Sequence, residues 1–126
     1  MSSSNAIGIV ELSRIASGYA TSDAMLKAAS VEMLLARSIC SGKYMVMVGG
    51  DVAGVQAAVA AGVAVSEGCV IDSAELSNLD PSVIPAISGA VEVGKLDALG
   101  VIESFSVTSL IEAADAAVQA ANVELI

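Results

Sequence analysis

The chain has 126 residues, the size of one domain, and its 14 acidic and 5 basic residues give a formal net charge of −9. The acidic residues are scattered, which argues against nucleic acid and anionic membranes, because both need clustered basic side chains. The absence of histidine excludes histidine metal ligands and histidine general bases. No apolar run reaches the ~18 residues of a transmembrane helix, and the N-terminus lacks the basic start of a signal peptide. Two cysteines make no disulfide framework and indicate a reducing cytosolic compartment.

The apolar content is high for so short a chain. Hydrophobic residues make up 56% of it and the mean hydropathy is +0.80, yet there are only one Phe, two Tyr and no Trp. Small aliphatic side chains therefore supply the core and allow helices to lie close to a sheet. The apolar surplus predicts a surface that is covered by a partner, and self-association is the most common form of such a contact.

Hydrophobic periodicity and turn residues predict seven elements in the first two thirds of the chain. In chain order they are a buried strand over 6–13, a helix over 18–30, strands over 31–39 and 44–49, a helix over 52–66, a strand over 69–76 and a short helix over 81–88. Asp51 is expected to cap the helix over 52–66. The second and third strands would form a hairpin across Ser41-Gly42. The order predicts an α+β fold, an α/β sandwich with a mostly antiparallel sheet and helices on one face.

An internal repeat divides the chain. Ala6-Ile-Gly-Ile-Val-Glu11 returns as Ala98-Leu-Gly-Val-Ile-Glu103, and the offset of 92 residues holds without a gap to Ile126. Ten of the 29 aligned positions are identical. The repeat predicts a complete domain over 1–88, a linker over 89–97, and the first part of a second domain over 98–126.

The second copy would contain a strand, a helix and the start of another strand. Its apolar stripe cannot be buried within so short a segment, so it must lie on the first unit, lie on a neighbouring chain, or stay disordered. We interpret the chain as a truncated form of a two-domain protein. The stripe consists of Leu110, Ile111, Ala114, Val118 and Ala121.

These motifs together resemble the bacterial microcompartment shell domain. The resemblance rests on Ala-Ile-Gly-Ile-Val-Glu from residue 6, Asp-Ala-Met-Leu-Lys-Ala-Ala-Ser-Val-Glu from residue 23, and Ser-Gly-Lys-Tyr-Met-Val-Met-Val-Gly-Gly-Asp from residue 41. Two such domains are typical of the tandem-domain class. The resemblance implies a structural shell protein in the bacterial cytoplasm that tiles facets as a homotrimeric pseudohexamer around a central pore, with other shell proteins as partners.

Within that class, Ser38-Ile-Cys-Ser-Gly-Lys43 is similar to the pore loop of tandem shell proteins from propanediol-utilisation compartments, in which the loop cysteine binds a [4Fe–4S] cluster. The resemblance assigns this role to Cys40, with one thiolate from each of three protomers on the threefold axis. Such a cluster would transfer electrons across the shell, with encapsulated redox enzymes as further partners. The subgroup often has proline after the cysteine, whereas this chain has Ser41.

The resemblance also assigns Ser41, Gly42 and Lys43 to the pore loop and places Lys27 at the tile edge, against its counterpart in the next tile. The second copy has Gln119 at that position. Simpler interpretations stay open: Cys40 as a free thiol, Lys43 as a solvated turn residue, and Lys27 as a lysine favoured at a helix C-terminus.

Two other function classes remain. Gly49-Gly50-Asp51 before a helix has a weak likeness to an anion-binding turn, so a small ligand-binding or regulatory module is the alternative. Enzyme activity is not expected, because the candidate acids lack a base or a nucleophile beside them. These acids are Asp23, Asp51, Asp72 and Glu75. Cys69 is interpreted as a small buried hydrophobic residue.

Overall fold

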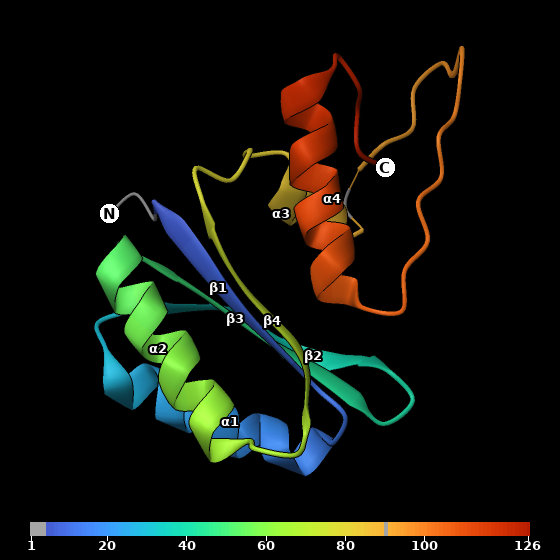
Figure 1. Cartoon of the computed structure of the whole chain (residues 1–126). Helices are drawn as coiled ribbons and strands as arrows, with labels where there is room; N and C mark the ends of the chain where they lie inside the picture. The colour runs from blue at the N-terminus through green and yellow to red at the C-terminus, as the bar shows by residue number, and fades with distance from the viewer. Residues whose placement is uncertain (1–4, 90) are drawn as a thin grey trace. The chain divides into compact units, whose positions relative to one another are not determined.

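The structure is a computed structural model that describes residues 5–89 and 91–126. The chain separates into two compact units, Met1–Asn78 and Leu79–Ile126. Unit 1 contains six elements and unit 2 contains two helices (Figure 1). The elements are β1 (Ala6–Leu12), α1 (Ile15–Ala28), β2 (Glu32–Cys40), β3 (Lys43–Gly50), α2 (Val52–Val65), β4 (Val70–Ser77), α3 (Val83–Ile87) and α4 (Val107–Ala120).

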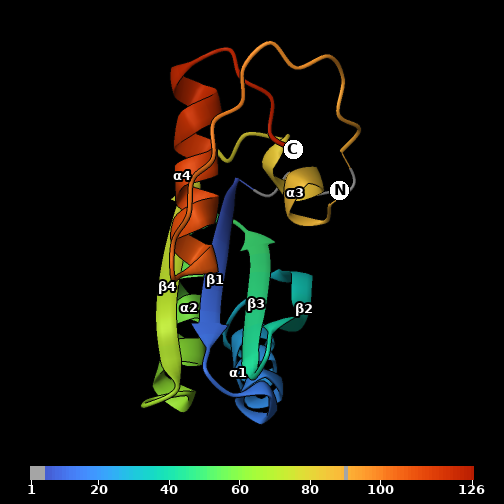
Figure 2. The same cartoon turned by 90° about the vertical axis from the view of Figure 1, so that its right-hand side faces the viewer.

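The sheet of unit 1 has the strand order β2-β3-β1-β4, and every neighbouring pair is antiparallel. Figure 2 shows the four strands side by side in this order. β1 is a central strand: Ile9 lies opposite Met47 of β3 and opposite Ala74 of β4. The α+β class, the antiparallel sheet and the β2–β3 hairpin are therefore confirmed.

The core of unit 1 lies between one face of the sheet and the helices α1 and α2. Val10, Val46 and Val48 face these helices and are fully buried. β1 has no side chain at Gly8, where a Cβ atom would lie 2.5 Å from Cγ2 of Val59. The small residue lets α2 approach β1 closely, as the aliphatic composition predicts.

Local sequence explains how each helix of unit 1 begins. Asp51 caps α2 as expected, because its Oδ1 accepts a hydrogen bond of 2.6 Å from the backbone N–H of Gly54. α1 begins at Ile15, three residues before the predicted start. Gly18 lowers helix propensity in its first turn, but a Cβ there would collide with the ring of Tyr44. The packing of Tyr44 against Gly18 thus lets α1 continue through this glycine, although glycine by itself weakens a helix.

Unit 2 is organised by Asp115 on α4. Its Oδ1 accepts a hydrogen bond of 2.8 Å from the backbone N–H of Asp80, and its Oδ2 accepts one of 2.8 Å from Nε2 of Gln119. The side chain is 9% exposed. Asp80 in turn accepts hydrogen bonds from the hydroxyl and the backbone N–H of Ser82, which lower its pKa. Asp115 therefore connects the segment before α3 to α4.

The second copy of the repeat lacks a strand that its sequence predicts. Unit 1 of the structure ends at Asn78, and the domain bounds 1–88, 89–97 and 98–126 stay a prediction. Residues 98–106 form no strand, although their sequence repeats that of β1. The physical reason is hydrogen bonding: β1 is paired on both sides by β3 and β4, and unit 2 as described has no strand to pair with 98–103.

Candidate functional site

The predicted pore loop is the tight turn of the β2–β3 hairpin. Cys40 ends β2 and lies opposite Lys43, which begins β3, so that only Ser41 and Gly42 form the turn. Gly42 has φ +78°, a left-handed conformation in which a side chain would be strained. A Cβ at this position would have no atom within 4 Å. The turn therefore projects from the sheet with open space around it.

The thiol of Cys40 is exposed at this turn, and Ser41 and Gly42 are exposed beside it. Lys43 is half-buried, and the residue is not without an interaction partner. The register of the hairpin shifts between Ser38 and Cys40. Such a bulge adds one residue to the strand and changes the direction in which the following side chains point. The hairpin thus presents one exposed thiol at the end of a strand that is paired with β3.

Tyr44, which the sequence analysis did not single out, anchors the base of this hairpin. Its ring packs against Gly18 of α1 and lies 5.8 Å from the ring of Tyr19, centroid to centroid. Tyr44 is 7% exposed. Burial, and then the nearby Tyr19, raise the pKa of the Tyr44 hydroxyl. No local pattern in the sequence signals this contact, because Gly18 and Tyr44 lie far apart in the chain.

Lys27 lies in the last turn of α1, with 74% of its side chain exposed. Its Nζ is 2.7 Å from Oδ2 of Asp23, one turn earlier in the helix. The ammonium is therefore held on the helix surface by a carboxylate of the same chain.

Lys27 and Cys40 do not belong to one site. Lys27 lies just before β2 begins at Glu32, and Cys40 is the last residue of that strand. A strand of this length separates its two ends by roughly 26 Å. The predicted edge residue precedes β2 and the predicted pore residue ends it, so the two lie toward opposite ends of this strand, which Figure 1 shows within the sheet.

The acidic residues considered for catalysis have separate partners or surroundings. Asp23 pairs with Lys27, Asp51 caps α2, and Oδ1 of Asp72 accepts a hydrogen bond of 2.9 Å from the backbone N–H of Ser73. Glu75 is exposed on β4. Because Asp51 occupies the N-terminus of α2 with its carboxylate, the turn before this helix does not offer its N–H groups to an anion.

Cys69 is half-buried, so the structure supports a packing position more than a reactive one. Its backbone accepts a hydrogen bond of 2.8 Å from the N–H of Ser13 and donates one of 2.8 Å to the carbonyl of Ser66. Within residues 5–89 and 91–126, no three Cys, Asp or Glu side chains gather as a metal site.

Comparison with known proteins places this geometry in a family. The BMC domain model matches residues 6–79 and again 98–126. The bacterial microcompartment shell protein PduT of Citrobacter freundii is 49% identical over 123 residues, which are 98% of this chain and 67% of that protein. A crystal structure of a microcompartment protein from Desulfitobacterium hafniense matches with a TM-score of 0.79 and 47% identity, over 94% of this chain and 66% of that one.

The two matched ranges reproduce the internal repeat, and the chain spans about two thirds of the length of these relatives. No helix among the residues that the structure describes is both long and apolar enough to cross a membrane. The fold, the repeated domain match and the identity to a shell protein lead to one conclusion: the chain belongs to the bacterial microcompartment shell-protein family and is a structural component of such a shell, similar to PduT.

Proposed function

We propose that this shell protein tiles a facet as a pseudohexameric trimer in which the β2–β3 turns of three protomers surround a central pore. The observation that carries the proposal is the exposed turn of Cys40, Ser41 and Gly42 at one end of β2, with Lys27 at the other end. A tile needs one surface at its centre and another at its edge. Unit 1 has a projecting loop at one end of β2 and an exposed lysine near the other, an arrangement that suits these two positions.

We propose further that Cys40 supplies a cluster ligand at the pore. A [4Fe–4S] cluster usually takes four thiolates, and each protomer offers one exposed thiol at the turn. Three protomers on a threefold axis would offer three, which fits a cluster whose remaining iron has a ligand from outside the protein. When bound, the group would supply one-electron transfer across the shell. Encapsulated redox enzymes are the partners that such transfer implies.

The neighbours of Cys40 suit this role. Gly42 adopts a conformation that a side chain would strain, so the turn stays narrow and would allow backbone to come close to a threefold axis. Ser41 carries only a small hydroxyl, and Lys43 would bring positive charge to the side of the turn that faces anionic solutes or the cluster. The ring of Tyr44 against Gly18 holds the base of the hairpin. The chain thus positions the thiol through backbone geometry and one buried aromatic residue.

The experiment compares three proteins purified anaerobically: the unchanged chain, Cys40→Ser and Cys69→Ser. Native mass spectrometry reports the oligomer and its iron, and visible absorbance reports the cluster. We expect iron and a broad visible band in the unchanged protein and in Cys69→Ser, and neither in Cys40→Ser. A colourless, iron-free unchanged protein would overturn the cluster, as would iron retained by Cys40→Ser. A monomer in all three would overturn the trimer.

A further inference from the structure

Lys27 and Gln119 occupy the same position in two copies of one helix. α1 and α4 have 14 residues each, and their bounds differ by the repeat offset of 92. Gln119 is thus the counterpart of Lys27, and Asp115 is the counterpart of Asp23, one turn earlier. In the tile proposed above, the two copies supply the edges in turn, so that Lys27 and Gln119 would lie at alternate edges.

Lys27 presents a positive charge and hydrogen-bond donors at the surface of α1. An ammonium group only donates hydrogen bonds, through several N–H groups, and Lys27 directs one of them at Oδ2 of Asp23, at 2.7 Å. The Lys27 side chain is 74% exposed. Its other N–H groups are therefore accessible to an acceptor on another molecule.

Gln119 presents a neutral acceptor at the surface of α4. Its Nε2 donates a hydrogen bond of 2.8 Å to Oδ2 of Asp115, which is 9% exposed and is itself held by the backbone N–H of Asp80. A carboxylate only accepts, so the amide turns its nitrogen toward Asp115 and its oxygen Oε1 away from it. Within residues 5–89 and 91–126, Oε1 accepts no hydrogen bond, and Gln119 is exposed.

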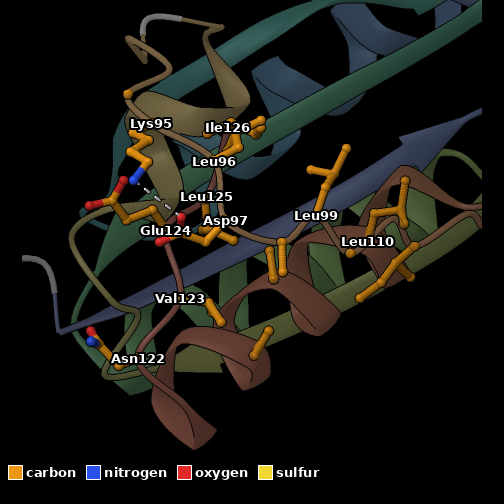
Figure 3. Close-up of a pocket in the computed structure, with 16 residues that line it drawn as sticks. Lys95, Leu96, Asp97, Leu99, Leu110, Asn122, Val123, Glu124, Leu125 and Ile126 are labelled. Atoms are coloured by element: carbon orange, nitrogen blue, oxygen red, sulfur yellow. Dashed lines mark ion pairs between the residues drawn. The ribbon is translucent and has the colours of Figure 1, made fainter.

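The exposure of Gln119 belongs to its position in the fold and not to the extent of unit 2. Unit 1 contains the whole four-stranded sheet and both of its helices, and Lys27 is nevertheless exposed there. The groove of unit 2, which Figure 3 shows, is lined by Ala114 and Ala117 of α4 but not by Gln119. The amide of Gln119 is thus presented outside this groove.

The donors and acceptors of the two positions favour unlike pairs. Lys27 against a second Lys27 would bring like charges and donors together, which costs affinity. Gln119 against a second Gln119 would bring two acceptors together, because each Nε2 is occupied by Asp115. Lys27 against Gln119 adds a charge-assisted hydrogen bond and breaks neither helical contact.

An ion pair between Lys27 and Asp23 of an adjacent copy is the other possible contact. It would replace the exposed pair that Lys27 already makes within α1. Exchange of one exposed ion pair for another stabilises an assembly little. The contact with Oε1 of Gln119 is therefore the one that gains a hydrogen bond.

The geometry of a tile turns this preference into an orientation. When two kinds of edge alternate around a hexagonal tile, opposite edges are unlike. A facet in which all tiles have the same orientation then places a Lys27 edge against a Gln119 edge at every contact. A tile that is rotated by one edge would meet like edges around its whole perimeter.

We propose that tiles join through heterologous contacts, in which the ammonium of Lys27 donates a hydrogen bond to Oε1 of Gln119 in the adjacent copy, and that this pairing gives all tiles of a facet one orientation. The partner of Lys27 is thus its repeat counterpart and not a second Lys27. The inference rests on the proposed tiling and does not involve the pore or iron.

The test makes all edges alike and then exchanges them. Lys27→Gln makes every edge neutral, and Gln119→Lys makes every edge cationic. Each variant installs the residue that the other copy already carries one turn after an aspartate, so the helices should fold as before. Sheet area in electron micrographs should fall about tenfold or more in both, since each contact loses a hydrogen bond to a charged group. The double variant Lys27→Gln/Gln119→Lys should restore the sheets.

Analytical ultracentrifugation tests the same contact in solution. Neither single variant should associate beyond its basic oligomer, whereas an equimolar mixture of the two should, because it again offers unlike edges.

Lys95→Gln and Gln56→Lys make the same two substitutions elsewhere and should behave like the unchanged chain. Figure 3 shows Lys95 outside the helices, with its Nζ 3.7 Å from Oδ1 of Asp97. Gln56 is exposed on α2.

The behaviour of Gln119→Lys decides the matter. Sheets as large as those of the unchanged chain, or larger, would overturn the proposal and assign the edge to Lys27 with a second Lys27 or with Asp23 of the neighbour. A double variant that forms no sheets, or a mixture that does not associate, would overturn it as well.

Native mass spectrometry separates this inference from the proposed function. Trimers of the unchanged chain without lateral association would overturn the edge contact and leave the trimer. A monomer would overturn the trimer, while the mixing experiment would still decide whether Lys27 of one copy binds Gln119 of another.

Discussion

Asp23 and Lys27 form an ion pair on α1, and the repeat preserves it as a hydrogen bond on α4. Nζ of Lys27 lies 2.7 Å from Oδ2 of Asp23, and Nε2 of Gln119 lies 2.8 Å from Oδ2 of Asp115. Both pairs are separated by four residues, one helical turn. The acid is retained in both copies, while its partner changes from a charged to a neutral donor. Only unit 1 therefore presents a lysine at this position.

The first prediction concerns the tile edge. Lys27→Asp should abolish the growth of two-dimensional sheets in electron micrographs while the oligomer in solution stays intact. The fold should lose less than about 1 kcal/mol, because an exposed helix pair is replaced by a weak repulsion with Asp23. Lys95→Asp makes the same change of charge at an exposed residue outside the helices and is the matched control. Sheets of normal size from Lys27→Asp would contradict the edge role.

The second prediction concerns the close approach of α2 to β1. Gly8→Ala should destabilise unit 1 by about 1–3 kcal/mol, because the added Cβ overlaps Val59 and Val55 in a packed core. Gly100→Ala in the chain alone should change the free energy of unfolding by less than about 0.5 kcal/mol, as surface substitutions generally do. Urea unfolding followed by far-UV circular dichroism measures both. Equal effects at the two glycines would show that the copies do not differ in packing.

The third prediction concerns the start of α2. Asp51→Ala removes the carboxylate that accepts the N–H of Gly54 and should cost about 0.5–2 kcal/mol in the free energy of unfolding. Asp51→Asn retains a side-chain oxygen at the cap and should cost much less. Urea midpoints of the two variants, compared with the unchanged chain, measure the difference. If both variants unfold alike, the hydrogen bond of Asp51 is not what stabilises this end of the helix.

The fourth prediction concerns Tyr44 and alkaline pH. Its pKa is raised in the folded chain from the ordinary 10.0, mainly by burial. The folded state therefore keeps the proton after the unfolded state has lost it. The resulting stability is complete below pH 10.0 and is lost as the pH rises through the folded-state pKa. Unfolding measured against pH should show this loss for the unchanged chain and for Tyr19→Phe.

Tyr44→Phe should remove that pH dependence, because phenylalanine has no proton to release. The comparison with Tyr19→Phe separates burial from the effect of the neighbouring ring, since the Tyr19 side chain is 69% exposed. Ultraviolet titration of phenolate formation in Tyr19→Phe, which leaves Tyr44 as the one tyrosine of the chain, gives the pKa of Tyr44 directly. A Tyr44 that titrates at the ordinary 10.0 would refute its burial.

The sequence by itself determined the elements of unit 1, their antiparallel hairpin, the cap at Asp51 and the repeat, because these depend on local periodicity and on turn and cap chemistry. It also located the turn that carries Cys40. It could not find the packing of Tyr44 on Gly18, or the contact of Asp115 with the backbone of Asp80, because such contacts join residues far apart in the chain.

Only the tertiary structure shows whether the second copy of the β1 sequence forms a strand. Residues 6–11 and 98–103 share the same pattern of aliphatic, glycine and glutamate residues, yet the first forms a central strand and the second forms none. A β-strand gains its hydrogen bonds from neighbours rather than from itself, whereas a helix satisfies its own backbone. For that reason α4 has the same length as α1 and bounds shifted by the repeat offset, whereas the copy of β1 lacks the pairing that would make it a strand.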